Sequence, residues 1–271
     1  MTQEIEDGLV TFVEELAREA GALAREKFGT KLEIDHKGFR DIVTEADYAA
    51  QRIITDRVRD RYPEHGFVTE EEDAELPGVQ AINWLIDPID GTTNYSRRHP
   101  LFCVSVAVAR GGDPRHERSE VLAGVIYDPM RDEMFSATLG GGATLNGDSM
   151  QVSDIASLGE RIIAVDWSRH RRLRQSTLDV VVNLAHEVTN VRAIGSAALA
   201  MAWVAAGRYD GYVNFNLNPW DVAAADLLVR EAGGALSDAQ GGPLNWSVKG
   251  ASVVATNGPI HEGLIDGIGL R

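Results

Sequence analysis

The side chains best suited to chemistry lie in one short segment, residues 87–93, with the sequence Asp-Pro-Ile-Asp-Gly-Thr-Thr. Pro88 cannot continue the hydrogen-bond ladder of a strand, so we expect the chain to turn there. In such a turn the carboxylates of Asp87 and Asp90 and the carbonyl of Ile89 can face the same side. Like charges about 4 Å apart repel by about 4 kcal/mol at an effective dielectric near 20, and a bound cation would keep the pair ionised. Oxygen ligands of this kind favour Mg²⁺ or Mn²⁺ over zinc.

The residues that follow suit a phosphate group. Gly91 permits a tight backbone, and Thr92 and Thr93 can begin a helix, whose first N–H groups are unpaired and carry partial positive charge. The simpler interpretation is that Asp90 caps this helix and Asp87 closes a turn, and for a single aspartate we would prefer it. Two carboxylates around Pro-Ile, followed by Gly-Thr-Thr, favour a combined site for cations and an anion.

The composition excludes several classes of protein. The chain has 271 residues, 44% of them hydrophobic and 25% charged, as in soluble globular proteins. A net charge of −15 argues against a nucleic-acid polymer as partner. No stretch approaches the roughly 20 apolar residues of a membrane helix, and the acidic start lacks the apolar run of a secretory signal. We therefore expect no membrane partner and a cytoplasmic location. The single cysteine, Cys103, excludes an intrachain disulfide and a thiolate metal cluster.

The pattern of apolar residues predicts the elements that position the segment. Helical spacing indicates helices over residues 4–28 and about 44–61. Short apolar and β-branched runs then predict strands at 66–69, 81–86, 102–109 and 121–127. The second half alternates strands with helices, which is typical of α/β architecture. We predict strands at 161–166, 191–194, 212–215 and 253–256, and helices at 173–186, about 195–207 and 221–232.

Motifs along most of the chain carry a family resemblance. Residues 87–93 are similar to the central signature of the inositol monophosphatase family, within the Mg²⁺-dependent, lithium-sensitive phosphatases. Other motifs of that family are matched in order and spacing by residues 41–47, 69–71, 195–198, 219–224 and 231–234. The resemblance implies a layered αβαβα sandwich, with an α+β domain over residues 1–155 that carries most metal ligands. An α/β domain over residues 156–271 would close the site with Asp221.

The resemblance also implies an activity, the Mg²⁺-dependent hydrolysis of a small phosphomonoester by metal-activated water, in a homodimer. Myo-inositol monophosphate is the favoured substrate, and fructose 1,6-bisphosphate, histidinol phosphate and phosphoadenosine phosphate are alternatives. A different class of function, a non-catalytic protein that binds a polyol phosphate, would keep the scaffold without turnover. A phosphodiesterase acting on a small nucleotide is a third possibility.

Carried over residue by residue, the resemblance implies a site with two to three cations. The metal ligands would be Glu70, Asp87, the carbonyl of Ile89, Asp90 and Asp221. Thr92 and Asp47 would activate the water, and Glu70 with water would hold the weaker third cation. The substrate would contact Gly91, Thr92, Thr93, Gly195, Ser196, Ala197, Asn214 and Asp221.

Each of these residues also has a structural interpretation. Thr44 and Asp47 have the spacing of a capping box, and Asp221 can cap the helix that follows it. Glu70 begins an acidic run over residues 70–73, which is usually a solvated loop. A capping residue can still face a site, so the two interpretations are compatible. The ordered occurrence of all the motifs favours the catalytic one.

Two departures from the family pattern bear on the substrate. Inositol-selective members have a glutamate seven residues before the aspartate of the Trp-Asp motif, where this chain has Asn214, which can still hydrogen-bond a hydroxyl. The family usually has a glycine shortly after Gly-Thr-Thr-Asn, where this chain has residues 96–99, Ser-Arg-Arg-His. Their positive charge could favour a bisphosphate. The arginines among residues 169–174 form either a solvated face or a second phosphate site, and the scattered histidines are interpreted as surface or packing residues.

Overall fold

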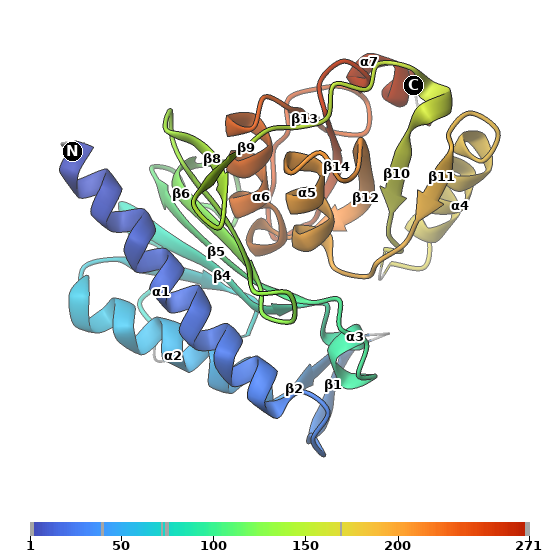
Figure 1. Cartoon of the computed structure of the whole chain (residues 1–271). Coiled ribbons are helices and arrows are strands. Elements are labelled where there is room, and N and C mark those ends of the chain that lie inside the picture. Colours follow the sequence, from blue (N-terminus) through green and yellow to red (C-terminus); the bar gives the residue numbers. More distant parts are fainter. Residues whose placement is uncertain (1–2, 39–40, 72, 74–75, 169, 269–271) are drawn as a thin grey trace.

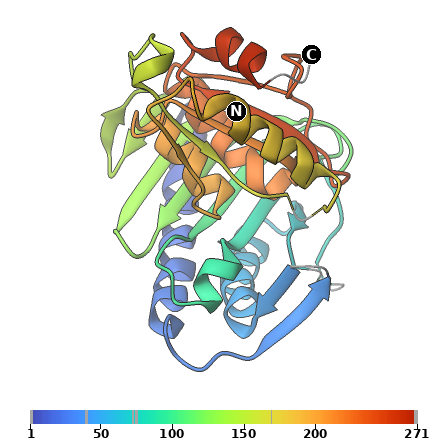
Figure 2. The same cartoon turned by 90° about the vertical axis from the view of Figure 1, so that its right-hand side faces the viewer.

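The chain folds into five stacked layers, two of them sheets and three of them pairs of helices. The computed structural model describes residues 3–38, 41–71, 73, 76–168 and 170–268. Figure 1 shows helices and sheets alternating across the molecule, and Figure 2 shows the same layers after a quarter turn. The order of the layers is helices, large sheet, helices, small sheet, helices, which confirms the predicted αβαβα sandwich.

The first half of the chain forms the large sheet and its outer helices. The outer helices are α1 (Gln3–Lys27) and α2 (Glu45–Arg61). The seven strands, in spatial order, are β3 (Gly66–Thr69), β4 (Ile82–Asp90), β5 (Cys103–Arg110), β6 (Glu120–Asp128), β7 (Glu133–Thr138), β8 (Gly142–Leu145) and β9 (Asp148–Met150). Neighbouring strands are antiparallel, except that β3 is parallel to β4. A hairpin of β1 (Ile34–Gly38) and β2 (Asp41–Thr44) and the short helix α3 (Thr92–Ser96) complete this half.

The second half forms the middle helices, the small sheet and the far helices. The middle helices are α5 (Ala197–Ala205) and α6 (Pro219–Glu231), and the far ones are α4 (Leu173–Leu184) and α7 (His261–Gly267). The five strands, in spatial order, are β11 (Asn190–Arg192), β10 (Ile162–Val165), β12 (Gly211–Leu217), β14 (Ala251–Thr256) and β13 (Ala235–Ser237), and a 3₁₀ turn, Leu158–Glu160, precedes them. The sheet is mixed, because β10 is parallel to β11 and β12 whereas β14 is antiparallel to both its neighbours.

Both faces of the large sheet are buried, and the alternation of side chains along β5 shows how. Val104, Val106 and Val108 pack against α1 and α2, whereas Cys103 and Ala107 belong to the core shared with α5 and α6. Successive side chains of a strand point to opposite faces, so a continuous apolar run suits a doubly covered sheet. The core between the large sheet and the helices α5 and α6 contains residues from both sides of position 155. The predicted domain boundary there stays a prediction.

No helix within the described residues has both the length and the apolar character that crossing a bilayer requires.

The strand that carries the chemistry is longer than predicted. We expected a strand over residues 81–86 that ends before Pro88, but β4 continues to Asp90. The pairing with β5 shifts register between Asp87 and Asp90, so that Pro88 lies in a bulge. Bulges are where a sheet tolerates proline, and they redirect neighbouring side chains. The two aspartates are therefore fixed by the sheet on either side of the bulge.

Helix α6 lies against the large sheet at Gly124, and this contact yields a prediction about stability. A Cβ at this position would lie 2.9 Å from the Cα of Ala224. We expect Gly124→Ala to lower the free energy of unfolding by about 1–3 kcal/mol, the usual cost of overpacking a core, as measured by urea denaturation. Gly8→Ala is the control, because Gly8 lies in α1 with open space around it, and alanine in a helix is favoured by about 0.5–1 kcal/mol. A Gly124→Ala protein as stable as the wild type would contradict the close packing of α6.

Candidate active site

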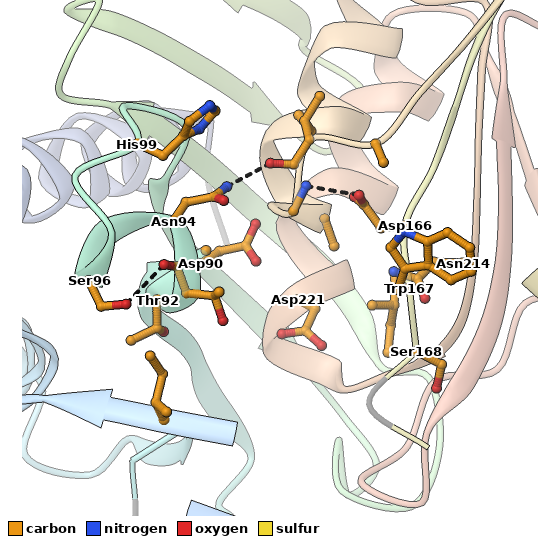
Figure 3. Close-up of a pocket in the computed structure, with 18 of the residues that line it drawn as sticks. Asp90, Thr92, Asn94, Ser96, His99, Asp166, Trp167, Ser168, Asn214 and Asp221 are labelled. Atoms are coloured by element: carbon orange, nitrogen blue, oxygen red, sulfur yellow. Dashed lines mark hydrogen bonds between the residues drawn. The ribbon is translucent and has the colours of Figure 1, made fainter. Parts of the chain in front are cut away.

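A cavity of about 1030 Å³ lies where the end of β4 and the start of α3 face the ends of β10 and β12 and the starts of α5 and α6. Figure 3 shows Asp90 and Thr92 on one side of it and Asp166, Asn214 and Asp221 on the other. Eight of the predicted site residues line it: Asp90, Gly91, Thr92, Thr93, Gly195, Ala197, Asn214 and Asp221. The remaining five, Asp47, Glu70, Asp87, Ile89 and Ser196, are not among the lining residues but lie next to the cluster that these residues form, as described below.

The start of α2 brings Asp47 to Thr92. The backbone N–H and the hydroxyl of Thr44 donate to Asp47 Oδ2 at 2.8 and 2.6 Å, so the predicted capping box forms. The other oxygen, Asp47 Oδ1, lies 3.3 Å from the Thr92 hydroxyl. That hydroxyl also lies 3.1 Å from the carbonyl oxygen of Ile89. The cap thus orients the carboxylate and leaves its second oxygen for Thr92.

The backbone at Gly91 has a conformation that favours glycine. Its φ is +104°, and a Cβ there would lie 2.9 Å from the carbonyl oxygen of Leu101. Asn94, in the short helix α3 that follows, donates from Nδ2 to the carbonyls of Leu101 (2.7 Å) and Ile194 (2.6 Å). The bond to Ile194 joins α3 to the segment that leads into α5. The two halves of the cavity are thereby held at a fixed spacing.

The carboxylate of Asp90 forms a second link between the halves. Its Oδ2 accepts hydrogen bonds from the Ser196 hydroxyl and the Ala198 N–H, both at 2.7 Å. We expected Ser196 on the alcohol side of the substrate, but it is 1% exposed and its hydroxyl is committed to Asp90. Gly195 and Ala197, on either side of it, line the cavity instead.

Four carboxylates converge at the base of the site. Burial raises the pKa of Asp87 well above its ordinary value, and the nearby carboxylates of Glu70, Asp90 and Asp221 raise it further. Glu70 also makes hydrogen-bond contact with Asp87. Burial raises the pKa of Asp90 too, although the hydrogen bonds from α5 act in the opposite direction. The cluster is therefore destabilised by its own charge unless protons or cations neutralise it.

The donor set of this cluster fits a hard divalent cation. Its atoms are carboxylate oxygens and the Ile89 carbonyl, and burial raises the pKa of the nearby Cys103 thiol, so no thiolate competes. Among the described residues no three acidic, histidine or cysteine side chains are already arranged as a metal-ligand set. Binding a cation would require Glu70 and Asp87 to exchange their mutual contact for the metal. Mg²⁺ or Mn²⁺ would relieve the repulsion that raises the pKa of Asp87.

Asp166, directly after β10, is a cavity residue that the motifs did not single out. Its Oδ1 accepts from the Gly195 N–H at 2.8 Å and its Oδ2 from the Tyr212 hydroxyl at 3.3 Å. Burial raises the pKa of Asp166 to about 6. The predicted strand over 161–166 ends on this residue, and ligands of α/β sheets bind beyond the carboxyl ends of strands. Its position at that strand end is the indication that could have found it.

Positive side chains also line the cavity. Arg97 and Arg174 belong to its wall, as do His36 and His99. Both histidines are exposed, as predicted for surface residues, and both lie at the wall of this cavity. Arg169, in the same predicted basic patch as Arg174, lies outside the described residues.

Comparison with known proteins identifies the family and the fold. The model of the inositol monophosphatase family matches residues 6–268, nearly the whole chain. The chain belongs to the inositol monophosphatase family. It is 43% identical to the Nus factor SuhB of Escherichia coli over 253 residues, which cover 92% of this chain and 91% of that protein. It is 37% identical to an inositol-1-monophosphatase of Mesorhizobium japonicum, over 96% of each chain.

A solved structure extends the similarity to three dimensions. The crystal structure of the extragenic suppressor protein suhB of Bartonella henselae superimposes with a TM-score of 0.89 at 34% identity, covering 97% of this chain and 99% of that one. The family resemblance inferred from the motifs is thus confirmed, and so is the inositol monophosphatase fold.

Proposed function

We propose that this protein is a Mg²⁺-dependent phosphomonoesterase that acts on a small phosphorylated polyol, with myo-inositol monophosphate as the favoured substrate. The observation that carries the proposal is the convergence of Glu70, Asp90 and Asp221 on Asp87. The hydrogen-bonded pair of Thr92, at the start of α3, and Asp47, at the start of α2, lies beside this cluster. Membership of the inositol monophosphatase family supports hydrolysis of a phosphate ester, and the Mesorhizobium relative supports the substrate.

The carboxylates would hold two to three cations. Glu70, Asp87 and the Ile89 carbonyl would hold the first, Asp87, Asp90 and Asp221 the second, and Glu70 with water a weaker third. When bound, Mg²⁺ neutralises the charge that develops on the phosphoryl oxygens and lowers the pKa of water. The bulge in β4 supports this assignment because it fixes Asp87, Ile89 and Asp90 on neighbouring positions of one rigid strand.

Thr92 and Asp47 would prepare the attacking water. The Thr92 hydroxyl can donate to Asp47 Oδ1, which leaves the Thr92 oxygen free to accept a hydrogen bond from water. As the water oxygen bonds to phosphorus, its proton passes to the Thr92 oxygen and the Thr92 proton passes to Asp47. The bond between phosphorus and the ester oxygen breaks, and the released alcohol takes a proton from solvent. No covalent enzyme intermediate is needed.

The remaining predicted residues would bind the substrate. The backbone amides of Gly91 and Thr92, with Thr93 beside them, would cradle the phosphate. The alcohol part would lie against Gly195, Ala197 and Asn214, which line the cavity wall. Ser196 would act from behind this wall, through its hydrogen bond to Asp90.

A phosphate-release assay tests the proposal. We expect turnover with millimolar Mg²⁺ and a fall of about 10³-fold or more with excess EDTA, because metal ions contribute several kcal/mol of transition-state stabilisation and each 1.36 kcal/mol is a factor of ten. The panel is myo-inositol 1-phosphate, fructose 1,6-bisphosphate, histidinol phosphate and phosphoadenosine phosphate, and the first should give the highest kcat/KM. Binding of the panel without turnover of any member would favour a non-catalytic polyol-phosphate-binding protein instead.

A further inference from the structure

Three side chains behind and along the cavity wall form a hydrogen-bonded row: Asp166, Tyr212 and Asn214. They come from the parallel neighbours β10 and β12, whose pairing places the end of β10 beside residue 213. The Tyr212 hydroxyl lies 3.3 Å from Asp166 Oδ2, and Asn214 Nδ2 lies 2.7 Å from the Tyr212 oxygen. Figure 3 shows Asp166 and Asn214 on the same side of the cavity, opposite Asp90 and Thr92.

The direction of each hydrogen bond in this row is fixed by its first member. Asp166 has a pKa raised to about 6 by burial, so above pH 7 it is mostly a carboxylate, which can only accept. Burial and the nearby Asp166 raise the pKa of Tyr212 well above its ordinary value, so Tyr212 keeps its single proton. That proton goes to Asp166, and the Tyr212 oxygen must then accept from its other neighbour. Asn214 accordingly presents its NH₂ group to Tyr212.

This orientation leaves the amide oxygen of Asn214 available to a ligand. Asn214 is 5% exposed and lines the cavity. Its Oδ1 is buried and has no hydrogen-bond partner among the described residues. Buried carbonyl oxygens are almost always paired in folded proteins, so an unpaired one on a cavity wall indicates a missing donor. A hydroxyl group of the substrate is a donor of the right size.

We propose that Asp166 determines which chemical group this wall accepts: acting through Tyr212, it holds Asn214 with its carbonyl toward the substrate, so that the wall binds a hydroxyl of a neutral polyol. This inference rests on the proposed phosphomonoesterase activity and names the part of the substrate that is recognised. A neutral amide at position 214 is then sufficient to bind a substrate hydroxyl, because an asparagine in this orientation offers an acceptor to the substrate. Asp166 is a positioning residue, and it does not need to touch the reacting atoms.

The carboxylate of Asp166 also weighs against a second phosphate at this wall. Arg174 lines the same cavity, but its guanidinium is stacked over the Trp167 ring, 4.9 Å from the centroid, and donates to the Ser168 carbonyl at 3.2 Å. It is therefore already engaged by neutral groups of the same segment. The test below distinguishes a wall that prefers a hydroxyl from one that prefers an anion.

The test compares a polyol ester with an ester that has no hydroxyl, in Asp166→Asn and Tyr212→Phe proteins. In Asp166→Asn the new amide can donate to the Tyr212 oxygen, so Tyr212 can donate to Asn214 and the amide of Asn214 can reverse. Tyr212→Phe removes the partner of Asn214 but keeps the bond from Gly195 to Asp166. We expect both variants to raise KM for myo-inositol 1-phosphate by about 5- to 150-fold, the range that an unpaired buried polar group costs. KM for phenyl phosphate should not change.

The matched control is Tyr127→Phe, which removes a tyrosine–aspartate hydrogen bond of 2.8 Å, to Asp132 rather than to a cavity residue. It should leave KM unchanged for both esters. Equal changes for both esters in the Asp166 and Tyr212 variants, or no change for either, would overturn the inference. A variant that gains affinity for fructose 1,6-bisphosphate while losing the inositol ester would support it, since the wall would then offer a donor.

Calorimetry in the presence of Ca²⁺ measures the affinities of the same two esters. These affinities test the inference even if the protein turns over neither ester. If the wild type releases no phosphate from any ester, the proposed function fails. The selective loss of myo-inositol 1-phosphate binding in the two variants would still be expected, and its absence would overturn the inference alone.

Discussion

Replacing Asp87 by asparagine is expected to abolish phosphate release while making the metal-free protein more stable. Asp87 lies at the centre of the carboxylate cluster, where Glu70, Asp90 and Asp221 all oppose its ionisation. An asparagine keeps the shape and can still accept the hydrogen bond from the Ile89 N–H, which is 3.0 Å long in the wild type. We expect kcat/KM to fall by about 10³-fold or more, because the variant lacks a charge that both proposed cations share.

The gain in stability has the same electrostatic cause. In EDTA the wild type must either keep Asp87 protonated or tolerate four close carboxylates, and both cost free energy relative to the unfolded chain. The asparagine variant avoids this cost. Each kcal/mol gained raises Tm by about 2–4 °C in a chain of this size. Mg²⁺ should raise Tm of the wild type by binding to the folded state, and this shift should be lost in the variant. Differential scanning fluorimetry with EDTA or Mg²⁺ measures both effects.

The control for this experiment is another buried aspartate with the opposite surroundings. Asp226 is fully buried, but it is paired with Arg118 Nε at 2.9 Å and Arg230 Nε at 2.6 Å. Asp226→Asn should therefore lower Tm and leave phosphate release per folded molecule unchanged. If Asp87→Asn lowers Tm in EDTA as Asp226→Asn does, Asp87 has a structural role and the carboxylates do not repel as argued.

The two outer helices of the first half could be predicted closely from the sequence because each has a buried stripe. Residues 4–28 and 44–61 were expected to be helical, and α1 and α2 run from Gln3 to Lys27 and from Glu45 to Arg61. Helix α6 begins at Pro219 instead of residue 221. The earlier start has a local reason, since the N–H of Asn218 donates to Asp221 Oδ2 at 2.7 Å and proline is favoured in the first turn.

The sheets were harder to predict, since strands depend on partners distant in sequence. The hairpin of β1 and β2 was missed because Ile-Asp-His-Lys-Gly has no apolar alternation. Its exposed strand is held by pairing with β2, which sequence patterns do not display. The extension of β4 past Pro88 also depends on a partner distant in sequence. The neighbouring strand β5 accommodates the bulge at Pro88, and the sequence pattern of β4 does not show this.

The site shows why structural and catalytic interpretations of one residue need not compete. Asp47 completes the capping box that its spacing predicts, whereas Asp221, expected to cap its helix, lies within the first turn and completes a capping box with Asn218. Both also reach the site. In each case one carboxylate oxygen accepts a hydrogen bond at the N-terminus of a helix. Asp47 Oδ1 also lies 3.3 Å from the Thr92 hydroxyl, and Asp221 lines the cavity. Asp166 has no such motif around it. Its position at the end of a predicted strand is the one indication in the sequence, and the pairing of β10 with β12 places it beside the site.

The second large effect is expected from Thr92→Val, which removes the hydroxyl between Asp47 and the proposed water. Valine has nearly the same shape, and Thr92 is only 5% exposed, so the turn should keep its conformation. General acid–base assistance contributes about 10²- to 10⁴-fold, and we expect kcat to fall within this range. KM should change little, because the hydroxyl is engaged by Asp47 and Ile89 and the proposed phosphate contacts are backbone amides.

The control is Thr55→Val, in the same helix as Asp47 but on a turn distant from the site. Thr55 is 2% exposed, and its hydroxyl donates to the Arg52 carbonyl at 3.3 Å, so it matches Thr92 in burial and in bonding to a local carbonyl. Loss of a buried hydroxyl alone would slow both variants equally or not at all. A selective fall in kcat for Thr92→Val, with the Mg²⁺-induced shift in Tm retained, would assign the hydroxyl to proton transfer. A loss of that shift would instead mean that Thr92 acts by holding the Ile89 carbonyl toward the cation.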